Sequence, residues 1–256
     1  MHKHWASRRS TGIMKAWDRN FIVGLYVFLM SNETSLLVFV KYPAPGKVKT
    51  RLGRQLGEDR SCRLYTLFVE WTLQRLARLR HMDCTIFFSP AEEADRFPAW
   101  LGGHYRYLAQ PEGDLGTRLC FGFETLLPTY SRVIAIGTDS PDLPLHYIEE
   151  ADISLQNHPL CIGPSEDGGY YLIGMTQLYP PLFENIPWST ASVFAETIHR
   201  ARQENIPFKQ LPTWYDIDTV EDIKKLFSNT CNVEFFEYLR QNNCANLGSF
   251  NLKPGN

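Results

Sequence analysis

Short apolar runs alternate with longer amphipathic segments along the chain from residue 36 onward. The runs have the length of buried strands, and they lie at 36–40, 85–88, 105–108, 133–136, 160–162, 170–173 and 207–211. The longer segments repeat apolar residues every three or four positions, as helices do, and they lie at 58–80, 117–127, 144–155, 190–204 and 219–227. Because helices separate most of the strands, the pattern predicts crossover connections between parallel strands.

This alternation predicts an α/β fold of the three-layer type, in which helices cover both faces of a mostly parallel, mixed sheet. We expect one domain over residues 35–228, preceded by an extension over 1–34 that is not part of the fold. Residues 229–256 should add a C-terminal helix and a frayed tail. Ligands of open α/β sheets bind at the carboxyl ends of the strands, so the polar segments that follow strands are the candidates for chemistry.

Composition and charge narrow the class of protein. Apolar residues make up 44% of the 256 positions, which excludes a disordered or fibrous chain. The net charge of -2 argues against a nucleic-acid partner held by a general positive field. The six cysteines form no C-x-x-C pair and the seven histidines no H-E-x-x-H motif, so we expect neither a zinc site nor a redox dithiol. Free thiols favour a reducing compartment, and we expect a cytoplasmic protein.

The N-terminal region superficially resembles a signal peptide, because basic residues precede an apolar run over 21–30. That run has ten residues, whereas a helix needs about 20 to cross a bilayer. The segment Ser31-Asn32-Glu33-Thr34 offers no small-x-small cleavage site. We therefore expect no stable membrane insertion and favour a non-native extension over a signal or anchor, with Met30 as an alternative start.

A basic loop follows the first predicted strand, with the sequence P-G-K-V-K-T-R-L. Lys47, Lys49 and Arg51 alternate, so an extended segment would point all three side chains the same way. Three converging cations would suit a di- or triphosphate, with the Arg51 guanidinium able to contact two oxygens. The alternative is a solvated basic loop. The G-x-x-x-x-G-K-[ST] phosphate-binding motif is absent.

Asp139 lies at the end of the run 133–136, in the segment G-T-D-S-P-D-L-P. Carboxylates at such a strand end can hold Mg²⁺ or Mn²⁺, which prefer oxygen ligands. We therefore interpret Asp139 as a metal ligand. Asp142 precedes Leu143-Pro144, and capping of the next helix is its favoured role.

Two further acidic segments follow predicted strands. In G-P-S-E-D-G-G-Y-Y, Glu166 and Asp167 are candidates to contact an acceptor, although D-G and G-G also mark a hairpin turn. In D-I-D-T-V-E-D, Asp218 with Glu221 resembles a capping box, which would account for Asp218 structurally. Asp216 has no capping role and is the better second metal carboxylate.

Two smaller segments open predicted helices. One runs from Gln110 to Arg118 and includes Asp114, and the other is Trp188-Ser189-Thr190. Both can serve as helix caps or as contacts to a base or an acceptor. Asp114 and Arg118 are our candidates for nucleotide contacts from the first segment.

These motifs, in this order, resemble the glycosyltransferase-A-like "transferase 1" family, which is associated with radical-SAM/selenodomain gene clusters. That family belongs to the nucleotide-diphospho-sugar transferase superfamily. The match covers about residues 36–227, and it is carried by P-G-K-V-K-T-R-L, G-D-L-G-T-R-L, G-T-D-S-P-D-L, G-P-S-E-D-G-G-Y-Y-L-I-G and D-I-D-T-V-E-D. The sequence is more distantly similar to 2-phospholactate guanylyltransferase and to the molybdenum-cofactor nucleotidyltransferases.

The resemblance implies roles for these residues. Lys47, Lys49 and Arg51 would bind nucleotide phosphates, Asp139 would take the position of the metal-binding aspartate, and Asp216 or Asp218 would complete the metal site. The motif here is D-S-P-D, whereas D-x-D is usual in glycosyltransferases.

The leading hypothesis is a transferase dependent on Mg²⁺ or Mn²⁺ that moves a glycosyl group from a nucleotide-diphospho-sugar to a small acceptor. In it, Glu166 or Asp167 would orient or deprotonate the acceptor hydroxyl. The main alternative is a nucleotidyltransferase that joins an NTP to a phosphorylated acceptor and releases pyrophosphate. A non-catalytic nucleotide-binding protein is a third hypothesis, and a homodimer is compatible with all three.

Overall fold

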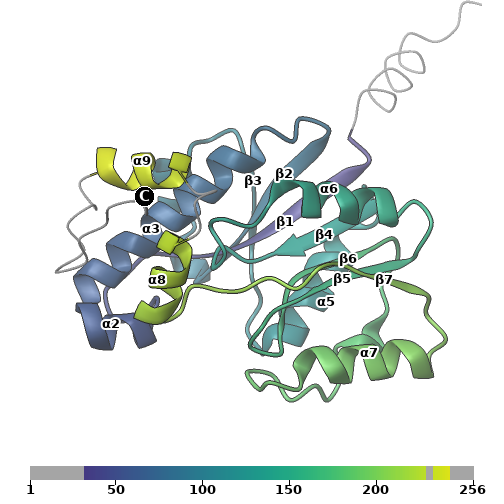
Figure 1. Cartoon of the computed structure of the whole chain (residues 1–256). Helices are drawn as coiled ribbons and strands as arrows, with labels where there is room; N and C mark the ends of the chain where they lie inside the picture. The colour runs from purple at the N-terminus through teal and green to yellow at the C-terminus, as the bar shows by residue number, and fades with distance from the viewer. Residues whose placement is uncertain (1–31, 229–232, 243–256) are drawn as a thin grey trace, which may run out of the picture. The chain divides into compact units, whose positions relative to one another are not determined.

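The computed structural model describes residues 32–228 and 233–242 (Figure 1). The predicted extension up to residue 31 and the predicted frayed tail from residue 243 lie outside the described residues. The strands are β1 (Thr34–Lys41), β2 (Met82–Ser89), β3 (Arg106–Ala109), β4 (Arg132–Ile136), β5 (Leu160–Pro164), β6 (Tyr170–Met175) and β7 (Phe208–Gln210). Each of the seven predicted strands is thereby confirmed, with ends that differ by a few residues.

The described helices cover the two faces of the sheet, and some of them pack together beside it. They are α2 (Thr50–Leu56), α3 (Glu58–Leu76), α4 (Arg96–Leu101), α5 (Leu115–Leu126), α6 (Leu145–Ser154), α7 (Val193–Gln203), α8 (Val220–Ser228) and α9 (Val233–Gln241), with 3-10 turns η1 (Ala91–Glu93) and η2 (Pro180–Leu182). None of these described helices is both long and apolar enough to cross a membrane.

The strands form one seven-stranded sheet in the order β3-β2-β1-β4-β6-β5-β7. Strand β6 pairs antiparallel with β4 and β5, while the other neighbouring strands are parallel. The predicted mostly parallel, mixed sheet is therefore correct. The reversal follows from the segment 165–169, a tight turn that joins β5 to β6 as a hairpin, as its D-G and G-G dipeptides allow.

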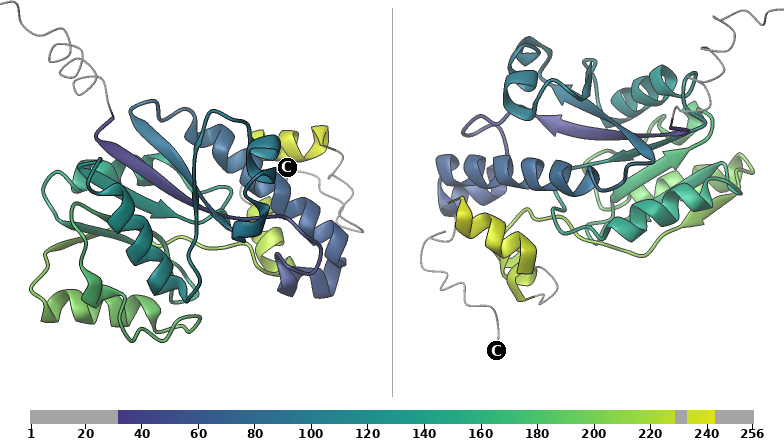
Figure 2. Two further views of the ribbon diagram at one scale, coloured as in Figure 1. Left: turned by 180° about the vertical axis from the view of Figure 1, so that it is seen from behind. Right: turned by 90° about the horizontal axis from the view of Figure 1, so that it is seen from above.

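Alternating side chains of β1 point to opposite faces of the sheet, because a strand has a two-residue period. Leu36 and Val38 are buried in the cluster that includes residues of α3 and α6, and Leu37 is buried in the cluster that includes residues of α5 and α7. Figure 2 shows helices on both sides of the sheet. The three-layer arrangement thus buries both faces, as an α/β sheet requires.

A third apolar cluster lies beside the sheet, where α2, α8 and α9 pack on α3 (left side of Figure 1). Its buried residues include Leu52 of α2, Trp71 of α3, Ile223 of α8 and Phe235 of α9. Ile217 is also fully buried there. This cluster consequently holds the segment that carries Asp216 and Asp218 against the rest of the domain.

The extended conformation predicted for Lys47–Arg51 is wrong. The Lys47 N–H donates to the Ala44 carbonyl in a turn, Lys49 adopts a left-handed conformation with φ 45°, and α2 begins at Thr50. Neither α2 nor α4 was predicted, because helices of six or seven residues are too short to show a clear period. Helix α7 begins at Val193, three residues later than predicted.

Candidate active site

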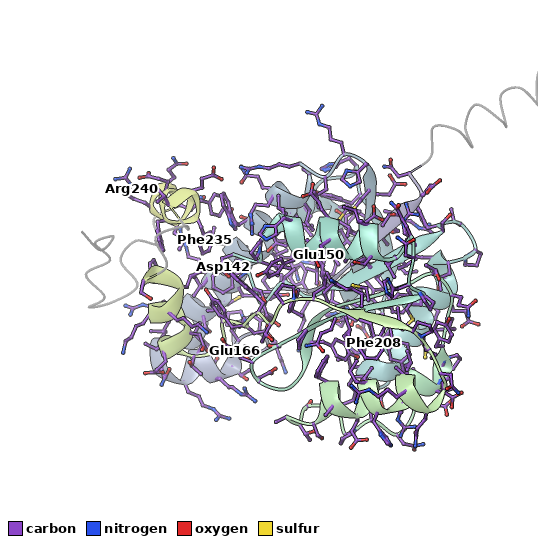
Figure 3. All side chains as sticks on the ribbon, turned by 45° about the vertical axis from the view of Figure 1, so that its right-hand side comes forward. Asp142, Glu150, Glu166, Phe208, Phe235 and Arg240 are labelled. Atoms are coloured by element: carbon purple, nitrogen blue, oxygen red, sulfur yellow. The ribbon has the colours of Figure 1, made fainter. Side chains whose placement is uncertain are left out.

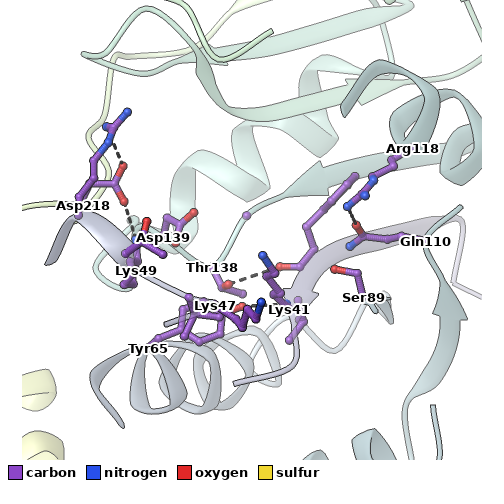
Figure 4. Close-up of a pocket in the computed structure, with 16 residues that line it drawn as sticks. Lys41, Lys47, Lys49, Tyr65, Ser89, Gln110, Arg118, Thr138, Asp139 and Asp218 are labelled. Carbon is purple, nitrogen blue, oxygen red and sulfur yellow. Dashed lines mark hydrogen bonds and ion pairs between the residues drawn. The ribbon is translucent and has the colours of Figure 1, made fainter. Parts of the chain in front are cut away.

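The carboxyl ends of the parallel strands β1, β2, β3 and β4 border a cavity of about 360 Å³ (Figure 4). Lys41 ends β1, Ser89 ends β2, Gln110 follows β3, and Asp139 follows β4 by three positions. Lys47, Lys49, Arg51 and Arg118 also line this cavity. The structure thus brings the predicted basic loop and Asp139 together at the expected edge of the sheet. We call this space the cationic cavity.

Lys49 differs from the other cations because its side chain is buried, with only 3% exposed. Its ammonium lies 2.6 Å from Asp139 Oδ1 and 2.9 Å from Asp218 Oδ1 (Figure 4). Burial by itself lowers the pKa of Lys49, but the charges of both carboxylates and their hydrogen bonds outweigh burial and raise this pKa above its ordinary value. Lys49 therefore stays charged and orients the two acids, so its three donors are largely committed before any phosphate binds.

Arg51 and Lys47 remain available to a ligand in different degrees. The Arg51 side chain is 71% exposed, and its Nη1 lies 3.6 Å from Asp218 Oδ2. Lys47 lines the cationic cavity beside Lys41 and Arg118. The three predicted cations line one cavity because a turn followed by a helix brings them there. They do not lie on a common face of an extended strand.

Asp218 does not cap α8, so the capping box predicted for Asp218 and Glu221 is wrong. The motif is shifted by one residue: Asp222 Oδ2 accepts the Thr219 N–H at 2.8 Å, and Thr219 Oγ1 accepts the Asp222 N–H at 3.3 Å. This reciprocal pair has the geometry of a capping box. The Asp218 carboxylate is thereby free to pair with Lys49 and Arg51.

Asp216 lies on the other side of Asp139 from most of the cations. Its Oδ1 accepts a hydrogen bond from Ser140 Oγ at 2.6 Å, and Ser165 Oγ lies 3.4 Å from its Oδ2. Burial, together with the negative charge of Asp139, raises the pKa of Asp216 to about 6. Asp139 and Asp216 line two further cavities together, one of about 280 Å³ and one of about 520 Å³. We call these the apolar cavity and the acidic cavity.

The fit of a metal ion depends on how many carboxylates are gathered. Within residues 32–228 and 233–242, no three His, Cys, Asp or Glu side chains are placed to hold a metal ion as a group. Asp139 and Asp218 both pair with Lys49, whereas no described ammonium or guanidinium pairs with Asp216, which hydrogen-bonds Ser140 and lines two cavities together with Asp139. Mg²⁺ is commonly bound by one or two protein carboxylates together with substrate phosphates, and two carboxylates fit that mode. They do not suffice to surround the ion with protein ligands alone. The donor set therefore favours Asp216 over Asp218.

Asp142 has a structural role that differs from the predicted helix cap. The N-cap position of α6 is Pro144, and the buried Asp142 carboxylate accepts hydrogen bonds from Tyr215 Oη and, at 3.3 Å, from Trp214 Nε1. These bonds join the loop after β4 to the segment that carries Asp216. The adjacent Trp214 and Tyr215 stand out in the sequence. Their partner could not be predicted locally, because Asp142 lies 73 positions from Tyr215.

Glu166 and Asp167 are adjacent but point to different surroundings. Both Glu166 carboxylate oxygens lie 2.7 Å from Lys225 Nζ of α8, and Glu166 is labelled in Figure 3. Asp167 lines the acidic cavity together with Asp139, Asp216 and Asp218. Among the two predicted acids, the geometry favours Asp167 as the residue able to contact an acceptor.

Asp114 and Arg118 also differ in their surroundings. Asp114 Oδ1 accepts the Thr117 N–H at 2.8 Å at the start of α5, and this bond with that of the Thr117 hydroxyl lowers the pKa of Asp114. Asp114 therefore caps the helix and lies outside the cationic cavity. Arg118 lines that cavity, and its Nη1 donates to Gln110 Oε1 at 2.9 Å (Figure 4).

Sequence reasoning did not single out Lys41 and Ser140. Lys41 lines the cationic cavity, and Ser140 hydrogen-bonds Asp216. Their signals were present, because Lys41 directly ends an apolar strand and Ser140 directly follows Asp139. A rule that considers every polar residue at a strand end and in the loop that follows it would have found both.

The fold and the site define an α/β protein with a cationic cavity and adjacent carboxylates at the carboxyl edge of its sheet. A protein of Desulfovibrio desulfuricans G20, provisionally named a nucleotide-diphospho-sugar transferase, has a structure similar to this chain with a TM-score of 0.78. The two sequences are 39% identical over 83% of this chain and 96% of that chain. The chain belongs to the family of this protein, and its residues 72–190 match the family model DUF2064, described as "Uncharacterized protein conserved in bacteria".

More distant structures share the fold. A nucleotidyl transferase of Methanothermobacter has 13% identity and a TM-score of 0.53, covering 82% of this chain and all of that chain. The 4-diphosphocytidyl-2C-methyl-D-erythritol synthase of Anaerococcus prevotii DSM 20548 has 14% identity and a TM-score of 0.50, covering 75% of this chain and 95% of that chain. No curated protein matched the sequence significantly.

Proposed function

We propose that this protein is a transferase that uses a nucleotide-activated donor, and that it transfers a glycosyl group from a nucleotide-diphospho-sugar to a small acceptor with the help of Mg²⁺ or Mn²⁺. The name of the Desulfovibrio relative and the cationic cavity support the use of a nucleotide. Membership of the radical-SAM-associated branch rests on the five sequence motifs alone. A cytoplasmic location, the lack of nucleic-acid and membrane partners, and a homodimer likewise stay predictions.

The distribution of charge around Asp139 carries the proposal. Lys41, Lys47 and Arg118 line the cationic cavity on one side. On the other side, the apolar cavity is lined by Asp139 and Asp216 and by none of the described Lys, Arg or His residues. A diphosphate therefore finds its countercharges on the first side only. The described residues of the apolar cavity offer a phosphorylated acceptor no cationic side chain, so a neutral acceptor fits better.

The residues would divide the work as follows. Lys47 and Arg118 would bind phosphate oxygens, while Lys49 orients the Asp139 carboxylate. Asp139 and Asp216 would hold the divalent ion, whose charge stabilises the diphosphate leaving group. Asp167 at the acidic cavity would orient the acceptor hydroxyl and accept its proton.

Nucleotidyl transfer is the second candidate, and a specific feature favours it. A cavity of about 450 Å³ continues from the cationic cavity and shares Lys41, Lys47 and Arg118 with it. These three cations and the added length would also suit a triphosphate, while the described residues of the extension itself add Glu93 and Glu112 and no further cation. Incubation with NTPs, Mg²⁺ and phosphorylated acceptors separates the two reactions, since only nucleotidyl transfer releases pyrophosphate.

The first test combines a ligand screen with the variant Asp139→Asn. We expect one class of nucleotide-sugar to raise the melting temperature of the protein only when Mn²⁺ is present, because a ligand that binds the folded state stabilises it. Asp139→Asn should lose the Mn²⁺-dependent increase and reduce turnover by roughly 100-fold, the usual effect of removing one well-placed charge. Thermal shift and a release assay for the nucleoside diphosphate measure the two effects.

The control is Asp95→Asn, an exposed substitution of the same kind that does not line these cavities. It should behave as the parent protein does. Retention of both metal-dependent binding and turnover by Asp139→Asn would contradict the proposed mechanism.

A further inference from the structure

The apolar cavity next to Asp139 has a composition unlike that of the cationic cavity. It occupies about 280 Å³ at the carboxyl end of β4, where residues of β4, of the paired strand β6 and of the start of α5 line it. Its lining is mainly carbon, from Phe39, Leu115, Leu119, Leu143 and Tyr170 among others. Cavities of this size and character bind compact apolar groups.

The two tyrosines of this lining offer their rings and not their hydroxyl groups. Tyr171 Oη donates to the Pro212 carbonyl at 3.0 Å, and Tyr170 Oη is completely buried. Polar side chains are therefore concentrated at one end, where Asp139, Ser140 and Asp216 lie. The apolar cavity adjoins the cationic cavity here, since Phe39, Gly137 and Asp139 line both.

The contrast between the two ends restricts the chemistry of a ligand. A charged group among the apolar side chains would lose its hydration without gaining a partner, which is strongly unfavourable. A phosphate or carboxylate would find no Lys, Arg or His side chain among the described residues that line this cavity. A neutral hydroxyl at that end can donate to either carboxylate, while an apolar body fills the remainder of the space.

We infer that the acceptor of the proposed transfer is a neutral alcohol with a compact apolar or aromatic body. This inference rests on the proposed function. The body lies against Phe39, Leu119 and Tyr170, and the hydroxyl points toward Asp139 and Asp216. The hydroxyl lies where the apolar cavity meets the acidic cavity, since Asp139 and Asp216 line both, and Asp167 lines the acidic side of this junction. In the transfer, the hydroxyl oxygen forms a bond to the anomeric carbon of the donor, the bond from that carbon to the diphosphate oxygen breaks, the proton passes to Asp167, and the nucleoside diphosphate leaves.

The test compares benzyl alcohol with glycerol as probes of the cavity, by ligand-observed NMR on the full chain. Benzyl alcohol should bind saturably, whereas glycerol should not. The variant Leu115→Glu places a charge at the mouth of the cavity, where Leu115 is 41% exposed. It should weaken benzyl alcohol binding roughly tenfold or more, because an apolar ring loses its apolar contact and meets a charge.

Two further variants control for side effects. Ile153→Glu introduces the same charge at a residue of α6 that is 61% exposed and does not line the cavity, so it should bind benzyl alcohol as the parent does. Leu115→Met keeps the apolar rim and should also retain binding. Equal binding of glycerol and benzyl alcohol, or unchanged binding by Leu115→Glu, would overturn the inference.

The nucleotide screen with Mn²⁺ is run on the same samples and separates the two proposals. If a nucleotide-sugar binds and benzyl alcohol does not, only the apolar acceptor is refuted. If benzyl alcohol binds in the cavity and no nucleotide binds with metal, the proposed function fails. Crystals soaked with benzyl alcohol would show whether its hydroxyl lies toward Asp139 and Asp216.

Discussion

Asp216 carries an electrostatic penalty in the protein without bound metal. Burial and the charge of Asp139 raise its pKa to about 6 from an ordinary value of 3.8. The folded protein therefore binds a proton at Asp216 more tightly than the unfolded chain does. The sign follows from linkage: stability falls as the pH rises from about 4 to about 6, and the full penalty remains at higher pH. A cation bound between Asp139 and Asp216 would remove this penalty.

The variant Asp216→Asn should accordingly make the metal-free protein more stable at pH 7.5, by on the order of 2 kcal/mol. Asparagine has no charge to desolvate, and its side-chain oxygen can still accept the hydrogen bond from Ser140 Oγ. Urea denaturation measures the free energy of unfolding. Below pH 4 the stabilisation should disappear, because Asp216 is then protonated in both states.

The same variant should lose the stabilisation by Mn²⁺ and nucleotide that the parent protein is expected to show. If the variant is more stable but inactive, Asp216 is linked to function. The charge of its carboxylate would then lower the stability of the metal-free protein and still be needed for activity. If Asp216→Asn is instead less stable than the parent at pH 7.5, the electrostatic argument is wrong.

At the scale of elements, the start of α8 determines where Asp218 points. Thr219 and Asp222 satisfy the first backbone N–H groups of the helix, as a capping box does. The Asp218 carboxylate then extends toward Lys49 of the loop before α2, 169 positions away in the sequence. One residue of shift in a capping motif thus decides whether an aspartate serves the helix or the site.

Thr219→Ala should lower the free energy of unfolding by about 1 kcal/mol, the usual effect of losing a helix cap. Glu221→Ala is the matched control, because the exposed Glu221 contacts Lys224 at 3.8 Å and takes no part in the cap. It should change stability by less than about 0.5 kcal/mol. Urea denaturation of both variants tests the assignment, and a larger loss for Glu221→Ala would restore the capping box predicted from the sequence.

At the scale of the whole described domain, the third apolar cluster connects the C-terminal helices to the site. Phe235 of α9, labelled in Figure 3, is 1% exposed. Its ring packs against those of Phe68 and Trp71 of α3. Tyr215 and Ile217 belong to the same cluster and flank Asp216. The family model ends at residue 190, so this part of the site is held by elements that lie beyond the matched segment.

Phe235→Ala should lower the free energy of unfolding by about 3 kcal/mol or more, because it leaves a cavity in a closely packed cluster. Phe236→Ala removes the same side chain from a partly exposed position of the same helix and should cost less. Chemical denaturation compares the two. Equal losses would indicate that α9 does not pack on α3 in the way described.

Much of the architecture was predictable from the sequence because it depends on local periodicity. The seven strands, the five longer helices and the polar segments at the strand ends each follow from residues close together in the chain. The reversal of β6 was only partly predictable, since the turn dipeptides of 165–169 fitted a hairpin and a ligand contact equally well. The short helices α2 and α4 left too few residues for a period to appear.

The chain's sequence by itself determined the layers, the polar edge and the set of acids and cations from which a site could form. Only the tertiary structure decided how they pair: that Lys49 is committed to Asp139 and Asp218, that Asp142 holds Trp214 and Tyr215, and that Glu166 contacts Lys225. The physical reason is that burial and charge pairing are set by neighbours in space, which here come from segments far apart in the sequence.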